Sequence, residues 1–248
     1  AIVVCIAMMV PTVAFAATSS PAKVDVKSAT AKSLTYNAKS QTTTIVVNGK
    51  TLTLNKDFKV VSGSLKATKA GTYTVKIKGI GNYSGDTTVK YTVNAQQSYK
   101  ATAAAKTYNA KNQTTKVTVK YGNTVLKRGT DYKITGVTKA KNAGKYKITV
   151  KGINNYKGTK TIYYTINKAA QKSVKVKVNA SKKKITVSGV KAKAKVTYKS
   201  ANKKVKVKNG KITVGKGVKK GTKVRITVKV AATKNYKAYS KSIIYKVK

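Results

Sequence analysis

The sequence predicts an all-β protein made of tandem small β-sandwiches, and three observations support this fold class. Apolar and basic residues alternate along many short segments, blocks of similar sequence recur 72 to 74 residues apart, and Gly or Asn-Gly steps separate the segments. Alternation with a period of two places Val and Ile on one face of a strand and Lys on the other. Many short strands of this kind, divided by turns, are typical of sandwiches with one face of each sheet in water.

The strands are predicted where the alternation is strictest. Val and Lys alternate through residues 174–178 and 204–208, and the same pattern runs through 145–151 and 223–230. Asn-Gly steps with strand residues on both sides favour two-residue hairpin turns. We therefore expect hairpin turns at Asn48-Gly49 and Asn209-Gly210.

The repeated blocks define the predicted domains. Tyr36–Lys39 recurs as Tyr108–Lys111, and Gly79–Gly85 recurs as Gly152–Gly158. A more divergent third unit begins near Ala169. The predicted organisation is a linker at 17–21, repeats at 22–95 and 96–168, and a divergent domain at 169–248. A domain of this size buries only about 60% of its unfolded surface, so each core should be thin, with Tyr as its large residue.

The first residues predict a targeting segment. Residues 1–16 are uncharged and apolar and end in Ala14-Phe15-Ala16, which fits the hydrophobic and cleavage regions of a secretory signal peptide. Without an initiator Met or a basic start, the stretch is interpreted as a partial signal peptide cleaved after Ala16. The only Cys, Cys5, would leave with it, and no later segment is predicted to span a membrane. Secretion without disulfides favours a Gram-positive bacterial surface.

The composition excludes most catalytic chemistry. The 248 residues include 54 Lys or Arg, four acids and no His, for a formal net charge of +50. Four scattered Asp cannot supply a typical catalytic carboxylate pair, and a Ser or Cys nucleophile has no His base. Zinc and EF-hand calcium sites lack their ligand types. We expect no enzyme activity, no cofactor and no metal.

The repeated motifs resemble known domain families. Units one and two are similar to the bacterial immunoglobulin-like surface repeats of Firmicutes, and unit three is similar to group-2 bacterial Ig-like domains. The resemblance departs from the family where its early Pro is replaced by Gln41-Thr42-Thr43 and where its acids are mostly Lys. The residues that carry it are Gly49, Leu52, Asp57-Phe58, Gly71 and Gly81–Gly85 in unit one, Leu126–Tyr132, Asn142–Gly144 and Asn155–Gly158 in unit two, and Tyr198–Ser200, Val205–Val207, Gly210–Val214 and Gly221-Thr222 in unit three.

The resemblance implies location and architecture, and no chemistry. It implies tandem small Ig-like β-sandwiches arranged as beads or a rod, which in this chain are preceded by the signal-peptide helix predicted from residues 1–16. Such domains form stalks, spacers and adhesive modules of secreted or cell-surface proteins.

The basic excess predicts anionic partners. Anionic cell-wall polymers such as teichoic acid, acidic polysaccharides and, without sequence specificity, nucleic acid all fit this charge. Arg128 and Arg225 are the only Arg, so base-specific readout through bidentate contacts is not expected. No small-molecule substrate is predicted. The candidate binding residues lie in predicted turns of unit three, where the alternative is ordinary solvated lysine: Lys182, Lys183, Lys184, Lys203, Lys204, Lys219 and Lys220.

Aromatic and acidic residues recur at equivalent positions of the repeats. Tyr83, Tyr156 and Tyr236 each follow an Asn and are candidates for stacking on sugars or bases. Their equivalent places in the units favour a turn or corner role instead. Asp57 and Asp131 precede an aromatic residue at equivalent positions, and a structural role in a turn is expected.

Two functional hypotheses remain open at this level. One is a structural or adhesive surface protein, a stalk or matrix component that adheres electrostatically to anionic polymers. The alternative is a cationic binding module for teichoic acid, DNA or acidic glycan, or a set of accessory domains of a larger surface enzyme. Because Lys occupies the outward strand positions of every unit, diffuse and salt-sensitive adhesion is predicted over one defined site.

Overall fold

The computed structural model describes residues 21–248, and this part of the chain is built from β-strands with two short 3-10 turns. The all-β class is confirmed. The predicted signal peptide at 1–16 lies outside the described residues, as do residues 17–20 of the predicted linker. The chain divides between Ala95 and Gln96 into two compact units. The first unit contains one β-sandwich and the second contains two.

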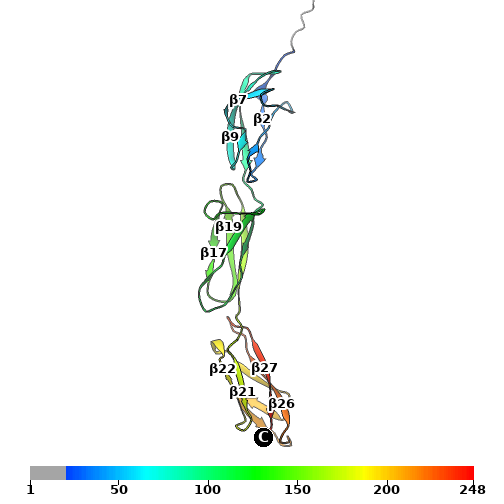
Figure 1. The fold of residues 1–248 in the computed structure, drawn as a ribbon, viewed down its shortest axis with the longest axis vertical. Helices are drawn as coiled ribbons and strands as arrows, with labels where there is room; N and C mark the ends of the chain where they lie inside the picture. The colour runs from blue at the N-terminus through cyan, green and yellow to red at the C-terminus, as the bar shows by residue number, and fades with distance from the viewer. Residues whose placement is uncertain (1–20) are drawn as a thin grey trace, which may run out of the picture. The chain divides into compact units, whose positions relative to one another are not determined.

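The first sandwich contains two facing layers of strands. Its larger sheet has the order β3-β11-β9-β7, and a smaller sheet has the order β2-β5-β6. Figure 1 shows β7 and β9 in one layer and β2 in the other. The elements are β1 Val24–Asp25, η1 Val26–Ser28, β2 Thr30–Ala31, β3 Leu34–Thr35, β4 Gln41–Thr42, β5 Ile45–Val47, β6 Lys50–Thr51, β7 Phe58–Gly63, β8 Lys66–Ala67, β9 Gly71–Gly79, β10 Tyr83–Ser84 and β11 Asp86–Asn94.

The core of the first sandwich is formed by alternate residues of both layers. Ile45 and Val47 of the smaller sheet share one buried cluster with Val75 and Ile77 of the larger sheet. The long strands β9 and β11 pair antiparallel, whereas β3 pairs parallel with the end of β11. A parallel pairing between an early strand and the last strand, within otherwise antiparallel sheets, gives the immunoglobulin-like arrangement.

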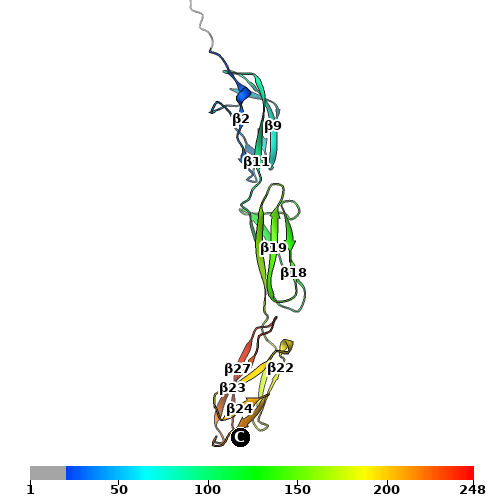
Figure 2. The same cartoon turned by 180° about the vertical axis from the view of Figure 1, so that it is seen from behind.

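The second sandwich repeats this topology. Its larger sheet has the order β13-β20-β19-β17, with β13 parallel to β20, and its smaller sheet has the order β12-β15-β16. In the view from behind, β19 is seen in this sheet (Figure 2). The elements are β12 Lys100–Ala103, β13 Lys106–Thr107, β14 Gln113–Thr114, β15 Val117–Tyr121, β16 Thr124–Val125, β17 Tyr132–Gly136, β18 Lys139–Ala140, β19 Gly144–Gly152 and β20 Thr159–Asn167.

The third sandwich follows in the second unit with a different strand arrangement. Its sheets have the orders β21-β22-β25-β24 and β23-β26-β27. Strand β26 coincides with the predicted alternation, and its Val224, Ile226, Val228 and Val230 are all buried. The elements are β21 Lys175–Asn179, β22 Lys184–Ser188, η2 Lys191–Lys193, β23 Val196–Ser200, β24 Val205–Lys208, β25 Lys211–Val214, β26 Lys223–Val230 and β27 Tyr239–Lys246.

Both predicted Asn-Gly hairpin turns are confirmed. Asn48 and Gly49 join β5 to β6 with φ values of 47° and 78°, and Asn209 and Gly210 join β24 to β25 with 50° and 78°. Two successive residues with positive φ are what a type I′ turn requires, and Asn followed by Gly reaches that conformation at low cost.

A tyrosine near the start of the long central strand fixes a corner in the first two sandwiches. The Tyr73 hydroxyl donates to the Lys69 carbonyl at 2.8 Å, and the Tyr146 hydroxyl donates to the Asn142 carbonyl at 2.7 Å. Such a bond to the backbone a few residues upstream is typical of immunoglobulin-like sandwiches. Each ring also stacks on the next strand, with centroids 5.2 Å apart in both the Tyr73–Tyr91 and Tyr146–Tyr164 pairs.

Candidate anion-binding surfaces

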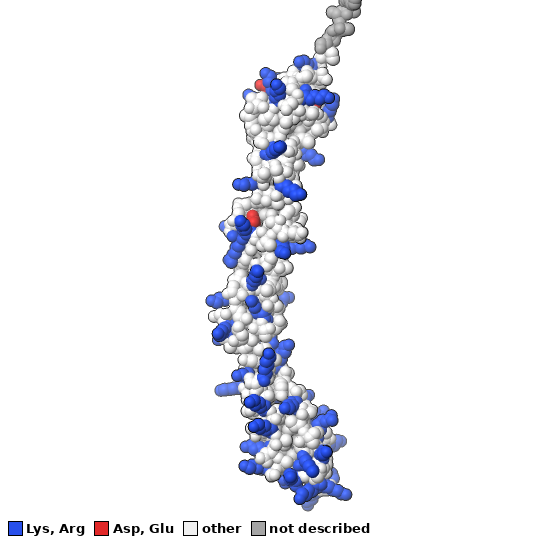
Figure 3. Space-filling view, viewed as in Figure 1, with Lys and Arg blue, Asp and Glu red and all other residues white. Residues whose placement is uncertain are grey.

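Lysines lie directly opposite one another on neighbouring strands in all three sandwiches. Figure 3 shows Lys and Arg spread over each sandwich on the face drawn, with little acid among them. Like charges in directly opposed positions destabilise a sheet. A polyanion that lies across such a pair would relieve the repulsion. The opposed pairs are Lys59–Lys78, Lys100–Lys120, Lys133–Lys151, Lys184–Lys211, Lys208–Lys211 and Lys223–Lys246.

The acids do little to neutralise this surface. The Asp57 carboxylate accepts a hydrogen bond from the Thr53 N–H at 2.8 Å, and the Asp131 carboxylate accepts one from the Lys127 N–H at 2.8 Å. The predicted structural role of these two acids is therefore confirmed. Asp25 lies 3.8 Å from the Lys27 amine in a largely exposed pair, a kind of contact that contributes little stability.

The seven predicted lysines of the third sandwich are all exposed, but they lie in or beside three separate turns, with Lys184 as the first residue of β22. The turn with Lys182, Lys183 and Lys184 lines a shallow hollow together with Lys211 of the neighbouring hairpin. Lys203 lines a second hollow with further lysines of β23 and β24. The backbone carbonyl of Lys204 accepts a hydrogen bond from the Gly215 N–H at 2.7 Å, which fixes the turn that contains Lys204.

The last two of these lysines, Lys219 and Lys220, lie in the turn before β26. The Lys219 carbonyl accepts a hydrogen bond from the Thr222 hydroxyl at 2.6 Å. Strand β26 then opens with Lys223 opposite Lys246. The seven predicted lysines therefore form several separate basic patches on the third sandwich.

The interpretation of the Asn-Tyr pairs as exposed stacking groups is wrong for two of them. Tyr83 and Tyr156 are 6% and 3% exposed. In each sandwich the Asn-Tyr pair lies against the first residues of the same domain, because the backbone carbonyl of the Asn accepts a hydrogen bond from a backbone N–H there. The bonds are Val24 N–H to Asn82, Gln96 N–H to Asn155 and Ala169 N–H to Asn235, at 2.9, 2.8 and 2.9 Å. The repetition therefore reflects the turn role.

The close packing of this loop also explains why the repeated motif begins with Gly, at Gly79 and Gly152. A Cβ on Gly79 would lie 2.7 Å from the Ser84 N, and one on Gly152 would lie 2.9 Å from the Lys157 N. Side-chain carbons do not approach backbone so closely, so only Gly lets the loop close onto the strand.

The third member, Tyr236, is half-buried and contacts the second sandwich. Its ring meets that of Tyr108 edge to face, with centroids 5.4 Å apart. Beside it the Asn235 side chain accepts from the Ala143 N–H at 2.8 Å and donates to the Asn142 side chain at 3.0 Å. Tyr236 therefore forms part of a domain junction within the second unit.

A buried tyrosine that sequence reasoning did not single out closes the second sandwich. Tyr99 is 2% exposed, and its hydroxyl accepts from the Gly152 N–H at 3.0 Å and donates to the Gly158 carbonyl at 2.7 Å. Burial raises the pKa of Tyr99, and the hydrogen bond from Gly152 partly offsets that rise. At the offset of 72 residues that relates the two repeats here, Lys27 takes this position in the first repeat, so the hydroxyl link is particular to the second.

Sequence reasoning also missed the exposed aromatic residue. All 16 tyrosines lie in the described part of the chain, and Tyr163, at 50% exposure, is the one that is exposed. The adjacent pair Tyr163-Tyr164 is the sequence feature that could have indicated this exposure. In an alternating strand neighbouring residues point to opposite faces, so a buried Tyr164 requires an outward Tyr163.

The fold defines the chain as a tandem array of immunoglobulin-like β-sandwich domains. A scan against protein-family models gives no match, and a search of curated proteins gives none. Among residues 21–248 no three His, Cys, Asp or Glu side chains gather into a group that could hold a metal ion. Nor does that part of the chain contain a helix long and apolar enough to span a membrane.

Solved structures with some similarity contain several domains in one chain. The eight N-terminal Ig domains of Down Syndrome Cell Adhesion Molecule match with a TM-score of 0.30 and 14% identity over 89% of this chain and 36% of theirs. Sidekick-1 immunoglobulin domains 1–5 match with a TM-score of 0.24 and 12% identity over 90% and 58%. Extracellular domains 3–5 of Drosophila OTK match with a TM-score of 0.30 and 8% identity over 93% and 98%.

Proposed function

We propose that this chain is a secreted, cell-surface protein of structural or adhesive type, whose tandem domains adhere to anionic polymers through a coat of lysines. The carrying observation is the register of the sheets. Lysines directly oppose lysines in all three sandwiches, and few acids are available to neutralise them. Because this repulsion lowers the stability of the sheet, we infer that the lysines serve binding and not folding.

The proposed adhesion is spread over the domains. Exposed lysines line the outward strand positions of each sandwich, and those in turns of the third sandwich are divided among separate places. Lys carries a compact, strongly hydrated charge and lacks the bidentate geometry of Arg. Contacts with carboxylate, sulfate or phosphate groups are then numerous, individually weak and insensitive to polymer sequence.

The bacterial surface location rests on the resemblance of the repeats to bacterial immunoglobulin-like domains and on the apolar first 16 residues. Anionic wall polymers and acidic polysaccharides are the partners that such a location offers. The chain would act as a stalk or matrix component, and no catalytic step is assigned to it.

The proposal is tested with one polymer in a charged and an uncharged form. The full chain is titrated with polygalacturonate and with its methyl ester, which keeps the sugar backbone and removes the carboxylate charges. We expect at least about tenfold tighter binding to the charged form, equivalent to about 1.4 kcal/mol. Equal affinity for the two forms, or no binding to either at low salt, would overturn it.

A further inference from the structure

The outer face of the larger sheet in the second sandwich differs from its counterparts. Tyr163 stands on this face in β20, directly opposite Lys147 of β19. The equivalent residue of the first sandwich is Lys90, opposite Thr74, and in the last strand of the third sandwich Ile244 stands opposite Arg225. The sandwiches share the basic surface, but only the second adds an exposed aromatic ring.

Basic and hydroxyl side chains surround the ring. The Lys145 amine lies over it, 4.4 Å from the centroid. On the same face Thr161 and Thr165 stand two residues away along β20, since alternate residues share a face. The Tyr163 face is defined by the side chains of Lys145, Lys147, Thr149, Thr161, Tyr163 and Thr165.

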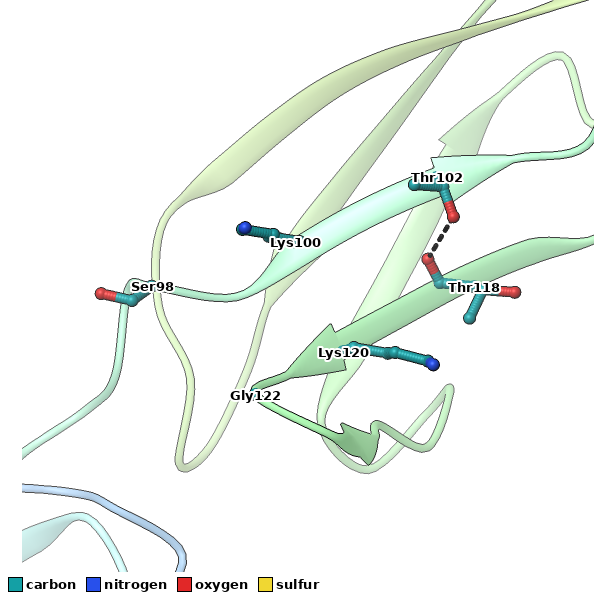
Figure 4. A pocket seen from close by; sticks show the side chains of 6 residues that line it. All are labelled: Ser98, Lys100, Thr102, Thr118, Lys120 and Gly122. Carbon is teal, nitrogen blue, oxygen red and sulfur yellow. Dashed lines mark hydrogen bonds between the residues drawn. The ribbon is translucent and has the colours of Figure 1, made fainter.

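Two adjoining hollows lie beyond the Tyr163 face, around the edge of the sandwich where β12 of the smaller sheet meets β20, and the second of them is on the outer face of that smaller sheet. The first runs between β12 and β20 and is lined by Lys100, Thr102, Lys160 and Thr161, so it shares Thr161 with the face. The second shares Lys100 and Thr102 with the first and adds Lys120. Figure 4 shows this second hollow, with Lys100 and Lys120 on neighbouring strands and the Thr102 hydroxyl bonded to the Thr118 carbonyl at 3.5 Å.

No carboxylate competes along this route. Asp131 is the one acid of residues 96–248, and its carboxylate accepts the Lys127 N–H. The route therefore offers positive charge, hydroxyl groups and one rigid ring to a chain-like anion.

We propose that the Tyr163 face and the two hollows bind a segment of acidic polysaccharide. The Tyr163 ring packs against a sugar ring, because its apolar body and polar tip match the mixed surface of a sugar. The lysines pair with carboxylates or sulfates, and the threonines exchange hydrogen bonds with sugar hydroxyls. This inference rests on the proposed function and adds to it one defined subsite.

The surface favours a polysaccharide over the other anionic polymers. Single-stranded nucleic acid is held by several aromatic side chains on which successive bases stack, whereas this face has one. A polyol-phosphate wall polymer offers no sugar ring in its backbone for Tyr163 to contact.

The test compares two substitutions at matched sites in the full chain. Tyr163→Thr removes the ring, and the control Ile244→Thr removes an equally exposed side chain that also faces a cation: Tyr163 is 50% exposed and Ile244 51%. Each variant is titrated with polygalacturonate at low and at physiological salt. We expect Tyr163→Thr to weaken binding about three- to tenfold at both salts, Tyr163→Phe to restore it, and Ile244→Thr to leave it unchanged.

The outcomes separate the subsite from the proposed function. Tight binding by the unsubstituted chain and equal affinity for all variants would overturn the subsite and leave the lysine-coat proposal standing. No binding by the unsubstituted chain would overturn both. An equal or larger loss with single-stranded oligothymidylate would reassign the face to nucleic acid and overturn the polysaccharide inference.

Discussion

Raising the NaCl concentration from 50 to 200 mM should weaken binding of the full chain to polygalacturonate by at least about a hundredfold. Each lysine that contacts a carboxylate displaces a counterion condensed on the polymer, so the logarithm of affinity falls linearly with the logarithm of salt concentration. Six to ten phosphate contacts on duplex DNA correspond to losses of about 10³ to 10⁵ over this range. A uronate polymer has a lower charge density than DNA, which is why we expect a smaller loss.

The slope of this plot also separates the two kinds of contact. Tyr163→Thr should shift the line downward without changing its slope, since ring packing releases no counterions. A slope near zero for the unsubstituted chain would contradict binding by a lysine coat. The measurement is a fluorescence or calorimetric titration at four or more salt concentrations.

Tyr99→Ala should destabilise the second sandwich by about 3–5 kcal/mol, the cost of truncating a large buried aromatic side chain. The substitution removes a ring that packs edge to face on Tyr156, with centroids 6.2 Å apart. It also removes the hydroxyl that joins Gly152 to Gly158. Marginal stabilities of about 0.05–0.15 kcal/mol per residue leave a domain of this size little reserve.

Calorimetry of the full chain measures this effect. The transition of the second sandwich should move down by on the order of 15 °C or more, while that of the first stays in place. Tyr163→Ala is the matched control, because it truncates an exposed tyrosine of the same domain and should change stability by less than about 0.5 kcal/mol. Equal shifts for the two variants would show that Tyr99 does not hold the fold.

Most of the strands could be predicted because the alternation is strict. Lys223–Val230 became one strand with every Val and Ile buried, and the Asn-Gly steps became type I′ turns. Asp57 and Asp131 bonded the backbone of their turns as expected. In each case residues near in sequence decide the outcome, so local patterns suffice.

Features that depend on packing between distant residues could not be predicted in the same way. Tyr83 and Tyr156 are buried because their loops return to the start of the domain, about 60 residues earlier in the chain. The contact of Tyr108 with Tyr236 joins residues of two domains, and no local pattern indicates it. The alternation of strand residues could have predicted that Tyr163 points outward, but the repeated Asn-Tyr pairs gave a stronger sequence signal.

Two sevenfold variants of the full chain test most directly whether the charge acts as a coat. One replaces by Gln the candidate turn lysines Lys182, Lys183, Lys184, Lys203, Lys204, Lys219 and Lys220. The other replaces seven exposed lysines of the first sandwich, Lys32, Lys50, Lys59, Lys66, Lys76, Lys78 and Lys90. A spread coat predicts that both lose affinity for polygalacturonate to the same degree, within about threefold, since each removes the same charge. A loss confined to the first variant would contradict the coat and establish the turns of the third sandwich as the binding site.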